Sequence, residues 1–330
     1  MNLNKKNVFV TGAGGFIGSH LCSHLLKNGA NVTAMLHYNS RSDWSNLEFL
    51  DKNERDSLEI VKGNVEDSSF MNSKTKNSDV IFHLAALIGI PYSYEAPLSY
   101  VKTNIEGTVN VLEAARRNDI ELIINTSTSE TYGSAIYTPI DELHPLQGQS
   151  PYSASKISAD KLAESYFNSF GLPVITVRPF NTFGPRQSSR AVIPTIISQL
   201  LTEKELLLGD TSPVRDFTYV DDTANGFICA ANNNDNNHGE VINLGYGKAI
   251  SIGETAGLIM EIMNINKEIV SENHRIRPKN SEVIHLISDN KKAADLIEWE
   301  PKITFKEGLE KTIKFVETNI DLFKTGTYSI

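Results

Sequence analysis

The stretch TGAGGFIGSH, residues 11–20, decides the fold of this chain, because its glycines lie between a predicted strand and a predicted helix. Gly12, Gly15 and Gly18 allow a tight turn and let the backbone approach a phosphate closely. A phosphate bound there would lie at the positive end of the helix that follows. Within that helix, apolar residues recur every four positions from Ile17 onward. The stretch therefore predicts a strand, a turn and a helix that together bind a dinucleotide.

Short β-branched and apolar runs recur through the first half of the chain, and segments of helical period separate most of them. Alternation of this kind predicts an α/β fold, a Rossmann-type doubly wound parallel sheet. From about residue 183, helical stretches mix with short strands. We therefore predict a dinucleotide-binding domain with the catalytic residues over residues 1–182 and a smaller mixed α/β lobe over residues 183–330, with a chain that can cross between them more than once. The runs are NVFVT (7–11), NVTAML (31–36), LEIVKG (58–63), DVIFHLAA (79–86), ELIINTST (121–128) and LPVITVRP (172–179).

The composition of the 330 residues argues against several classes of function. A formal net charge of -9 without blocks of like charge leaves no electrostatic footprint for nucleic acid. Cys22 and Cys229 fit neither a metal-ligand spacing nor a disulfide framework, so we expect buried thiols and no metal. We expect no signal peptide, and no apolar run reaches the roughly 18 residues of a membrane span. The expected location is the cytoplasm, without a membrane partner.

The spacing of the first glycines, G-x-x-G-x-x-G, resembles that of the extended short-chain dehydrogenase/reductase family. The segments HLAA (83–86), KTNIEGTVNVLEAA (102–115) and SPYSASK (150–156) extend the resemblance along the chain. The resemblance implies an NAD or NADP cofactor that is regenerated in each turnover. The cofactor contacts that it implies are Gly12, Gly15, Phe16, Ile17, Gly18, Ser40, Arg41, Asn64, Val65, Leu84, Ala85, Ala86, Asn104, Tyr152 and Lys156.

Two positions depart from the family pattern. NAD-preferring members usually place an aspartate at the end of the second strand, whereas this strand ends MLHYNSR (35–41) without an acid. His37, Ser40 and Arg41 can accommodate a 2'-phosphate, so NADP is allowed beside NAD. Asn64 replaces the acid that usually contacts the adenine, and asparagine still donates and accepts hydrogen bonds. The choice between NAD and NADP stays open.

Tyr152 and Lys156 form a Y-x-x-x-K pair on a predicted helix. The pair is weak evidence by itself, since among 11 tyrosines one such match by chance has about even odds. Its position after the fifth strand makes it more specific. Residues i and i+4 share a helix face, so the charge of Lys156 can favour the phenolate of Tyr152. The pair predicts a base for a sugar hydroxyl near neutral pH.

The stretch NTSTSETYGS, residues 125–134, places Glu130 at the end of a predicted buried strand, where an unpaired carboxylate is costly. In the family this segment supplies a hydroxyl to the reacting sugar hydroxyl, and Thr128 matches it. Simple 4-epimerases carry small or apolar residues next, whereas nucleotide-sugar 4,6-dehydratases carry an acid pair or a Ser-Glu pair, here Ser129 and Glu130. The resemblance implies that Glu130 removes the C5 proton. Ser129 either relays a proton to the departing hydroxyl or only orients Glu130, which can also return the proton itself.

Polar and charged residues in the second half resemble the family's contacts to a nucleotide-diphosphate sugar, which we therefore expect as the substrate. Arginine suits a diphosphate because its planar fork makes two charge-assisted hydrogen bonds. The expected contacts are Asn181, Arg186, Arg215, Arg277 and Glu282, in the segments RPFNTFGPR (178–186), PVRDFTYVDD (213–222) and RIRPKNSEV (275–283).

These residues together resemble those of a redox-neutral nucleotide-sugar 4,6-dehydratase. The resemblance implies that Tyr152, with Thr128 and Lys156, takes the 4-hydroxyl proton while hydride passes from C4 to the nicotinamide. Glu130 then removes the C5 proton, water leaves from C6, and the hydride returns to C6. The product is a 4-keto-6-deoxy sugar.

A narrower resemblance points to one substrate, and three rival functions stay open. The segments at residues 88–108 and 190–200 are most similar to GDP-N-acetylglucosamine 4,6-dehydratases of legionaminic acid synthesis. A UDP-glucuronate decarboxylase also has a Ser-Glu pair, but its tyrosine segment differs from SPYSASK. A 4-epimerase would lack Glu130. A non-catalytic dinucleotide sensor would typically lose Tyr152 or Lys156.

Many family members dimerise through two helices per subunit, so we expect a homodimer. Val101, Ile105, Val109 and Leu112 give the first of these helices an apolar face. The same apolar stripe is equally suited to packing against the protein's own sheet.

Overall fold

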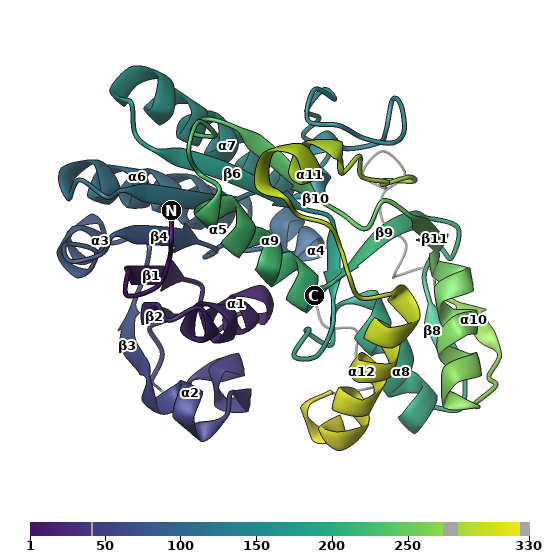
Figure 1. Cartoon of the computed structure of the whole chain (residues 1–330). Coiled ribbons are helices and arrows are strands. Elements are labelled where there is room, and N and C mark those ends of the chain that lie inside the picture. The colour runs from purple at the N-terminus through teal and green to yellow at the C-terminus, as the bar shows by residue number, and fades with distance from the viewer. Residues whose placement is uncertain (41, 273–282, 324–330) are drawn as a thin grey trace.

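The computed structural model describes residues 1–40, 42–272 and 283–323, and its centre is a seven-stranded parallel sheet (Figure 1). The strands lie in the order β10-β6-β5-β4-β1-β2-β3, and each neighbouring pair is parallel. The predicted doubly wound α/β fold is therefore confirmed. The strands are β1 (Asn7–Thr11), β2 (Asn31–His37), β3 (Leu58–Gly63), β4 (Val80–His83), β5 (Leu122–Thr126), β6 (Val174–Pro179) and β10 (Val241–Leu244).

Helices cover both faces of this sheet, because its strands are apolar on both sides. Val8 and Val10 of β1 enter one core and Phe9 enters the other, since successive side chains alternate across a strand. The first core packs against α1 (Phe16–Lys27), α9 (Val220–Asn232) and α11 (Lys291–Ile297). The second packs against α3 (Ser68–Lys74), α6 (Gly107–Arg117) and α7 (Pro151–Phe170).

The apolar stripe that begins at Val101 is divided between the core and the surface. Leu112, on α6, is 1% exposed and belongs to the core beneath the sheet. Val101 is 39% exposed. Part of the stripe thus faces the protein's own sheet, and the homodimer stays a prediction.

A smaller lobe is built around short strands and three helices. Its core contains Ile196, Ile259 and Leu309, one from each helix. Figure 1 shows the three helices gathered beside the short strands. The strands are β7 (Asn181–Phe183), β9 (Val214–Tyr219) and β11 (Ala249–Ser251) in one sheet and β8 (Leu206–Leu208) with β12 (Ile269–Ser271) in another, and the helices are α8 (Val192–Thr202), α10 (Ile252–Met263) and α12 (Phe305–Thr318).

The chain crosses between the two parts after residue 183. α9 packs on α1, and β10 pairs with β6 at the edge of the large sheet. The sequence pattern alone did not assign these two elements to the large sheet. The domain division at residue 182 stays a prediction.

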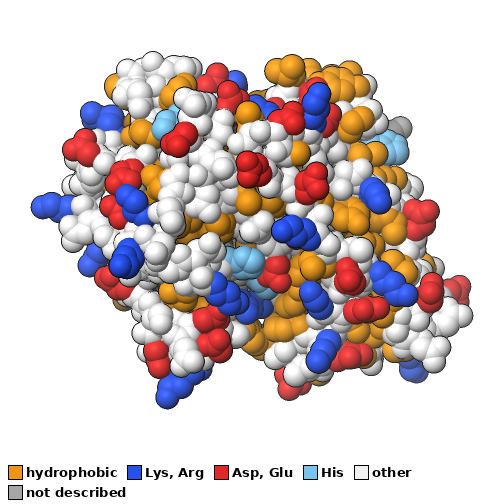
Figure 2. All heavy atoms as spheres, in the orientation of Figure 1, with side chains coloured by type: hydrophobic (Ala, Val, Ile, Leu, Met, Phe, Trp, Pro, Cys, Tyr) orange, Lys and Arg blue, Asp and Glu red, His pale blue; other side chains and the backbone are white. Residues whose placement is uncertain are grey.

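Short helical segments complete the structure. None of the helices in the described ranges is long and apolar enough to cross a membrane. Figure 2 shows cationic and anionic side chains interspersed over the face that it draws. The segments are η1 (Ser45–Phe49), α2 (Lys52–Asp56), α4 (Ile90–Glu95), α5 (Pro97–Tyr100), the π-helical turn η2 (Val101–Glu106), η3 (Ser129–Tyr132) and η6 (Ile320–Leu322).

Candidate active site

Three segments that the sequence singled out follow the carboxyl ends of β1, β4 and β5. The glycine turn follows β1, the loop at residues 84–87 follows β4, and η3 follows β5. β1 and β4 are paired neighbours at the point where the strand order reverses. Ligands of open parallel sheets bind in the crevice at such a point.

The glycine turn packs closely against its own backbone and against the loop after β4. Gly12 has φ +68°, and a Cβ there would lie 2.8 Å from the backbone nitrogen of Ala85. A Cβ on Gly18 would lie 2.2 Å from the carbonyl oxygen of Gly12. Gly15 is the N-cap of α1 and brings no side chain to the first helical amides. These amides, at the start of a 12-residue helix, suit a phosphate, so the residues fit a dinucleotide.

The loop after β4 is fixed by a hydrogen-bond chain that starts at Thr11. The Thr11 hydroxyl oxygen accepts from the backbone amides of Leu84 and Ala85, both at 3.1 Å, and its proton is available to Nδ1 of His83 at 2.9 Å. On the other side of the ring, Nε2 of His83 lies 3.1 Å from the Thr108 hydroxyl. Burial lowers the pKa of His83 to about 3, so the ring is neutral. The neutral ring, with Nε2–H donating, holds the predicted cofactor loop in place.

Asn104 clamps the same loop onto α7. Its side-chain oxygen accepts from Leu87 N at 2.8 Å, and its amide donates to Leu87 O and to the Ser155 hydroxyl, both at 2.9 Å. Asn104 lies in η2, and π-helical turns often occur at functional sites. The structure thus gives Asn104 a positioning task beside the predicted cofactor contact.

The remaining predicted cofactor contacts divide by burial. Phe16, Ile17 and Ala86 are partly buried, Val65 is 5% exposed, and Asn64 and Ser40 are exposed. Arg41 lies outside the described residues. The roles of these side chains stay predictions.

Tyr152 and Lys156 lie buried on the first turns of α7, 7% and 4% exposed. The helix starts at Pro151, and a capping box fixes that start: Ser150 Oγ accepts from Ser153 N at 3.1 Å, and Ser153 Oγ accepts from Ser150 N at 2.9 Å. The ammonium of Lys156 donates to the carbonyl oxygen of Thr126 at 2.6 Å. The end of β5 and the start of α7 are therefore joined directly at the predicted site.

The protonation of this pair depends on burial and on neighbouring charges. Burial raises the pKa of Tyr152 well above its ordinary value, a hydrogen bond with Thr128 lowers it, and Glu130 raises it again. Burial lowers the pKa of Lys156, whereas the carboxylate of Asp160 raises it. The tyrosine is thus protonated in the free protein, and it needs positive charge nearby to act as a base.

Glu130 lies in the short helix η3, directly after β5. Thr128 is the N-cap of η3, and its hydroxyl accepts from Glu130 N at 3.3 Å. The Thr131 hydroxyl donates to Thr128 O at 2.7 Å, which closes the turn. Glu130 is half-buried, and Ser129 is 3% exposed. The turn therefore brings the Glu130 carboxylate, two residues after Thr128, close enough to Tyr152 to influence its pKa.

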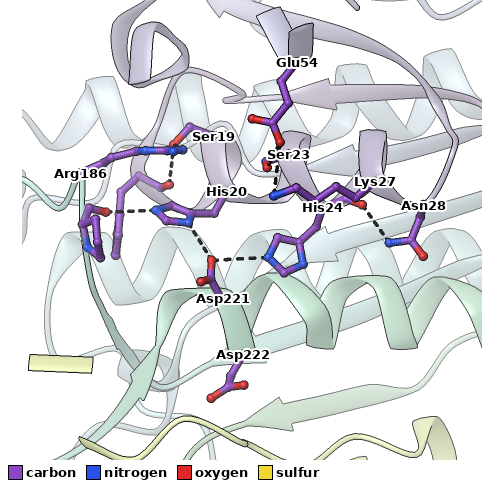
Figure 3. Close-up of polar contacts among 12 residues, drawn as sticks. Ser19, His20, Ser23, His24, Lys27, Asn28, Glu54, Arg186, Asp221 and Asp222 are labelled. Carbon is purple, nitrogen blue, oxygen red and sulfur yellow. Dashed lines mark hydrogen bonds and ion pairs between the residues drawn. The ribbon is translucent and has the colours of Figure 1, made fainter. Parts of the chain in front are cut away.

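Two of the predicted substrate contacts lie at or near β7: Asn181 is its first residue, and Arg186 follows its end. The side-chain oxygen of Asn181 is buried and has no hydrogen-bond partner among the described residues. Arg186 has φ +71°, and its guanidinium lies 3.4 Å from Ser19 Oγ of α1 (Figure 3). The same guanidinium lies 3.5 Å from Phe49 O. Its described contacts are thus with the dinucleotide-binding part, and a role toward substrate stays a prediction.

Arg215 lies on β9 and is 7% exposed, with Nη1 donating to Val214 O at 3.1 Å. Its neighbour Asp216 accepts three backbone hydrogen bonds, from Tyr246 N, Gly247 N and Ser288 N, at 2.6, 2.9 and 3.0 Å. These bonds tie the loops after β10 and before α11 to β9 beside Arg215. Arg277 and Glu282, the other two predicted substrate contacts, lie outside the described residues.

Sequence reasoning missed a polar contact between α1 and α9. Asp221 Oδ1 lies 2.9 Å from His20 Nδ1 and 3.4 Å from His24 Nε2, and His20 Nε2 lies 3.1 Å from Pro185 O. Figure 3 shows Asp221 between the two rings. The sequence signal for this contact was the pair of histidines, His20 and His24, one helical turn apart. The contact anchors the glycine-turn helix to the segment that carries Arg186.

A buried ion pair beside Lys156 was also missed. Arg178 Nη2 donates to Asp160 Oδ2 at 2.7 Å, and the two side chains are 2% and 4% exposed. Ser127 Oγ donates to the same carboxylate oxygen at 2.5 Å and accepts from Arg178 Nε at 3.2 Å. An arginine inside the apolar run LPVITVRP was the available signal, because a buried charge needs a partner.

A family model described as GDP-mannose 4,6 dehydratase matches residues 9–312 of this chain. The chain belongs to this family of nucleotide-sugar dehydratases and epimerases. It is 31% identical to a putative UDP-glucose 4-epimerase of Methanocaldococcus jannaschii, over 94% of this chain and 99% of the relative. It is 30% identical to a dTDP-glucose 4,6-dehydratase of Streptomyces antibioticus, over 95% and 93%.

The solved relatives of this dehydratase and epimerase family share the whole fold. DesIV, a dTDP-glucose 4,6-dehydratase of Streptomyces venezuelae solved with NAD bound, is 26% identical and superposes with a TM-score of 0.87 over 96% of this chain and 99% of that one. Family members named as dehydratases and as epimerases match this chain about equally well. Overall similarity therefore identifies the family, whereas the reaction has to be inferred from the residues of the site.

Proposed function

We propose that this protein is a nucleotide-sugar 4,6-dehydratase that converts a nucleotide-diphosphate hexose into its 4-keto-6-deoxy form. The observation that carries the proposal is Glu130, a half-buried carboxylate in η3 that acts on the pKa of Tyr152. A 4-epimerase has to hold a 4-keto sugar without removing its C5 proton. A carboxylate at this place favours elimination instead.

The cofactor is NAD or NADP, which the solved family members with bound NAD and the shape of the glycine turn both support. Gly12, Gly15 and the first amides of α1 would hold the pyrophosphate, and the loop at residues 84–87 would line the remainder. When bound, the nicotinamide supplies a reversible acceptor for hydride, so that the overall reaction is redox-neutral.

The protein's own residues move the protons. Tyr152 takes the proton of the 4-hydroxyl, with the Thr128 hydroxyl as hydrogen-bond partner and the Lys156 charge favouring the phenolate. The resulting 4-keto group makes the C5 proton acidic, and Glu130 removes it. The C6 hydroxyl then leaves with a proton as water, delivered from Glu130 or through Ser129, and C5 takes a proton that comes from solvent when C6 is reduced. Each of these roles rests on the placement of the side chains around the end of β5.

GDP-N-acetylglucosamine is the proposed substrate, in the synthesis of legionaminic acid, and the proposed assembly is a homodimer in the cytoplasm. The resemblance of residues 88–108 and 190–200 to enzymes of that specificity supports the substrate. The proposed substrate contacts are Asn181, Arg186, Arg215, Arg277 and Glu282, and the guanidinium groups of the three arginines suit a diphosphate. The exposed Val101 end of the apolar stripe supports the dimer.

The assay for the reaction class is incubation of the purified protein with GDP-, UDP-, dTDP- and CDP-linked sugars in deuterated water, followed by mass spectrometry. We expect GDP-N-acetylglucosamine to lose one water and gain one deuterium. Loss of carbon dioxide from UDP-glucuronate would instead identify a decarboxylase. An unchanged mass with every donor would contradict dehydration, and epimerisation is then checked by NMR, since the names of several relatives favour it.

The glycine turn provides a test of the cofactor site. In Gly18→Ala the new Cβ would lie 2.2 Å from the Gly12 carbonyl oxygen, so the turn has to open. We expect about 1–3 kcal/mol of lost stability and at least about 10-fold weaker NAD(P) binding, measured by thermal unfolding and calorimetry. Gly257→Ala on α10 is the control, because its Cβ meets nothing within 4 Å. Equal binding by the two variants would contradict this account of the turn.

A further inference from the structure

We propose that Asp160 is a positioning residue of the active site: with Arg178 and Ser127 it holds the end of β5 against α7, and it keeps Lys156 in its charged form. The proposal goes beyond the proposed function. It rests on that function only for the measurement of kcat described below. It assigns a task to a buried ion pair that contacts no expected ligand.

Three consecutive residues at the end of β5 serve three different groups. The carbonyl oxygen of Thr126 accepts from Lys156, the Ser127 hydroxyl bonds to the ion pair, and the Thr128 hydroxyl bonds to Tyr152. Ser127 is itself held in the sheet, because its amide donates to Val177 O at 2.7 Å. A movement of Ser127 would therefore displace the partners of both Tyr152 and Lys156.

The carboxylate of Asp160 also provides negative charge close to Lys156. Asp160 follows Lys156 by one helical turn on α7, and both side chains are buried. Its Oδ2 atom carries the bonds from Arg178 and Ser127, while its Oδ1 atom is buried without a hydrogen-bond partner among the described residues. A carboxylate left partly unsatisfied in an apolar setting retains a strong field, which favours protonation of a lysine one turn away.

The surroundings of Lys156 contain few other charges that can replace Asp160. The guanidinium of Arg178 lies 4.6 Å from the ring centroid of Tyr132 and adds a second buried cation. Without Asp160, two cations would share this region, which disfavours the charged form of Lys156. Among the described residues, the titratable and charged groups that surround Lys156 or its neighbour Tyr152 are Tyr152 and Asp160 on α7, Tyr100 on α5, His83 on β4, Glu130 in η3 and Arg178 on β6.

The test of the charge arm is the titration of Lys156 itself, followed by NMR of protein labelled with ¹³C-lysine and assigned with Lys156→Met. In Asp160→Asn we expect the pKa of Lys156 to fall by about one pH unit or more. Glu164→Gln is the matched control, since it removes a carboxylate from the same helix at a site 49% exposed. An unchanged Lys156 titration in Asp160→Asn would overturn the proposal. This measurement uses no substrate, so it is independent of the proposed function.

Asp160→Asn leaves Arg178 buried without its counter-charge, so a second variant guards against loss of folding. Asp160→Asn/Arg178→Gln removes both charges and keeps groups that hydrogen-bond each other. We expect it to fold and to show the same direction of change at Lys156. If neither variant folds, the pair belongs to the stability of the fold alone and the proposal is wrong.

The orientation arm is tested by Ser127→Ala, which keeps the ion pair and removes its tie to β5. We expect kcat to fall about 10-fold with KM unchanged, because a displaced Thr128 affects the transition state more than binding. The pKa of Lys156 should change less than in Asp160→Asn, because the carboxylate of Asp160 is retained. Unchanged kcat would overturn this arm, and absence of dehydratase activity in the unaltered protein would instead refute the proposed function.

Discussion

Replacing Glu130 by glutamine is expected to lower kcat for loss of water by about 10³-fold or more, with little change in KM. The amide keeps the size of the side chain but cannot take a proton from C5. The half-buried position of Glu130 in η3 limits the access of water that could act as a substitute base. The measurement is the rate of water loss by mass spectrometry, together with deuterium exchange at C5 in deuterated water.

Glu121→Gln is the matched control for this variant. Glu121 lies just before the other end of β5, where it pairs with Lys6 at 2.6 Å and is 46% exposed on its side chain. The same chemical change at this place should leave kcat unaltered. Near-normal water loss by Glu130→Gln, with C5 exchange intact, would remove Glu130 from the mechanism and assign the removal of the C5 proton to another group.

Replacing Tyr152 by phenylalanine is expected to lower kcat by about 10²- to 10⁴-fold while the protein keeps its fold and its affinity for substrate. The ring still packs against Tyr100, whose centroid lies 6.2 Å away, so the loss is confined to the hydroxyl. Circular dichroism and calorimetric binding of the nucleotide sugar are the checks on structure and affinity. Tyr166→Phe on the same helix is the control.

The pH dependence of the unaltered enzyme belongs to the same prediction. Burial raises the pKa of Tyr152 well above its ordinary value, so the phenolate is scarce near neutral pH and kcat should rise as the pH increases. The rise should end where Lys156, whose pKa burial lowers, loses its charge. Residual activity of Tyr152→Phe should lack the rising part. A rising limb that persists in this variant would assign the base to another group.

Much of the large sheet could be predicted because its signals are local. Strand runs and the glycine turn are contiguous in sequence, and parallel pairing then brings the ends of β1, β4 and β5 to one edge. The predicted tight turn is present, and a side chain on Gly12 or Gly18 would meet the backbone of the turn or of the loop after β4. Placement of Tyr152 beside Lys156 followed from helical period alone.

Other features depend on contacts between distant residues, which no local pattern contains. β10 returns to the large sheet after the small lobe has begun, and its pairing with β6 is fixed by tertiary packing. Arg186 contacts Ser19 and Phe49, which lie 167 and 137 residues earlier in the chain. The ion pair of Asp160 and Arg178 joins a helix to a strand. Neither residue alone indicates in the sequence that it is buried and paired.

The measurement that tests dehydration most directly is the fate of a deuterium label placed at C4 of GDP-N-acetylglucosamine, or of whichever donor the mass-spectrometric assay identifies. The reaction runs in ordinary water, and NMR locates the label in the product. Transfer of the label from C4 to the new methyl group at C6 is the result expected of a 4,6-dehydratase, because the hydride taken from C4 returns at C6. A label that remains at C4 of an epimerised sugar, with the C6 hydroxyl intact, would contradict it.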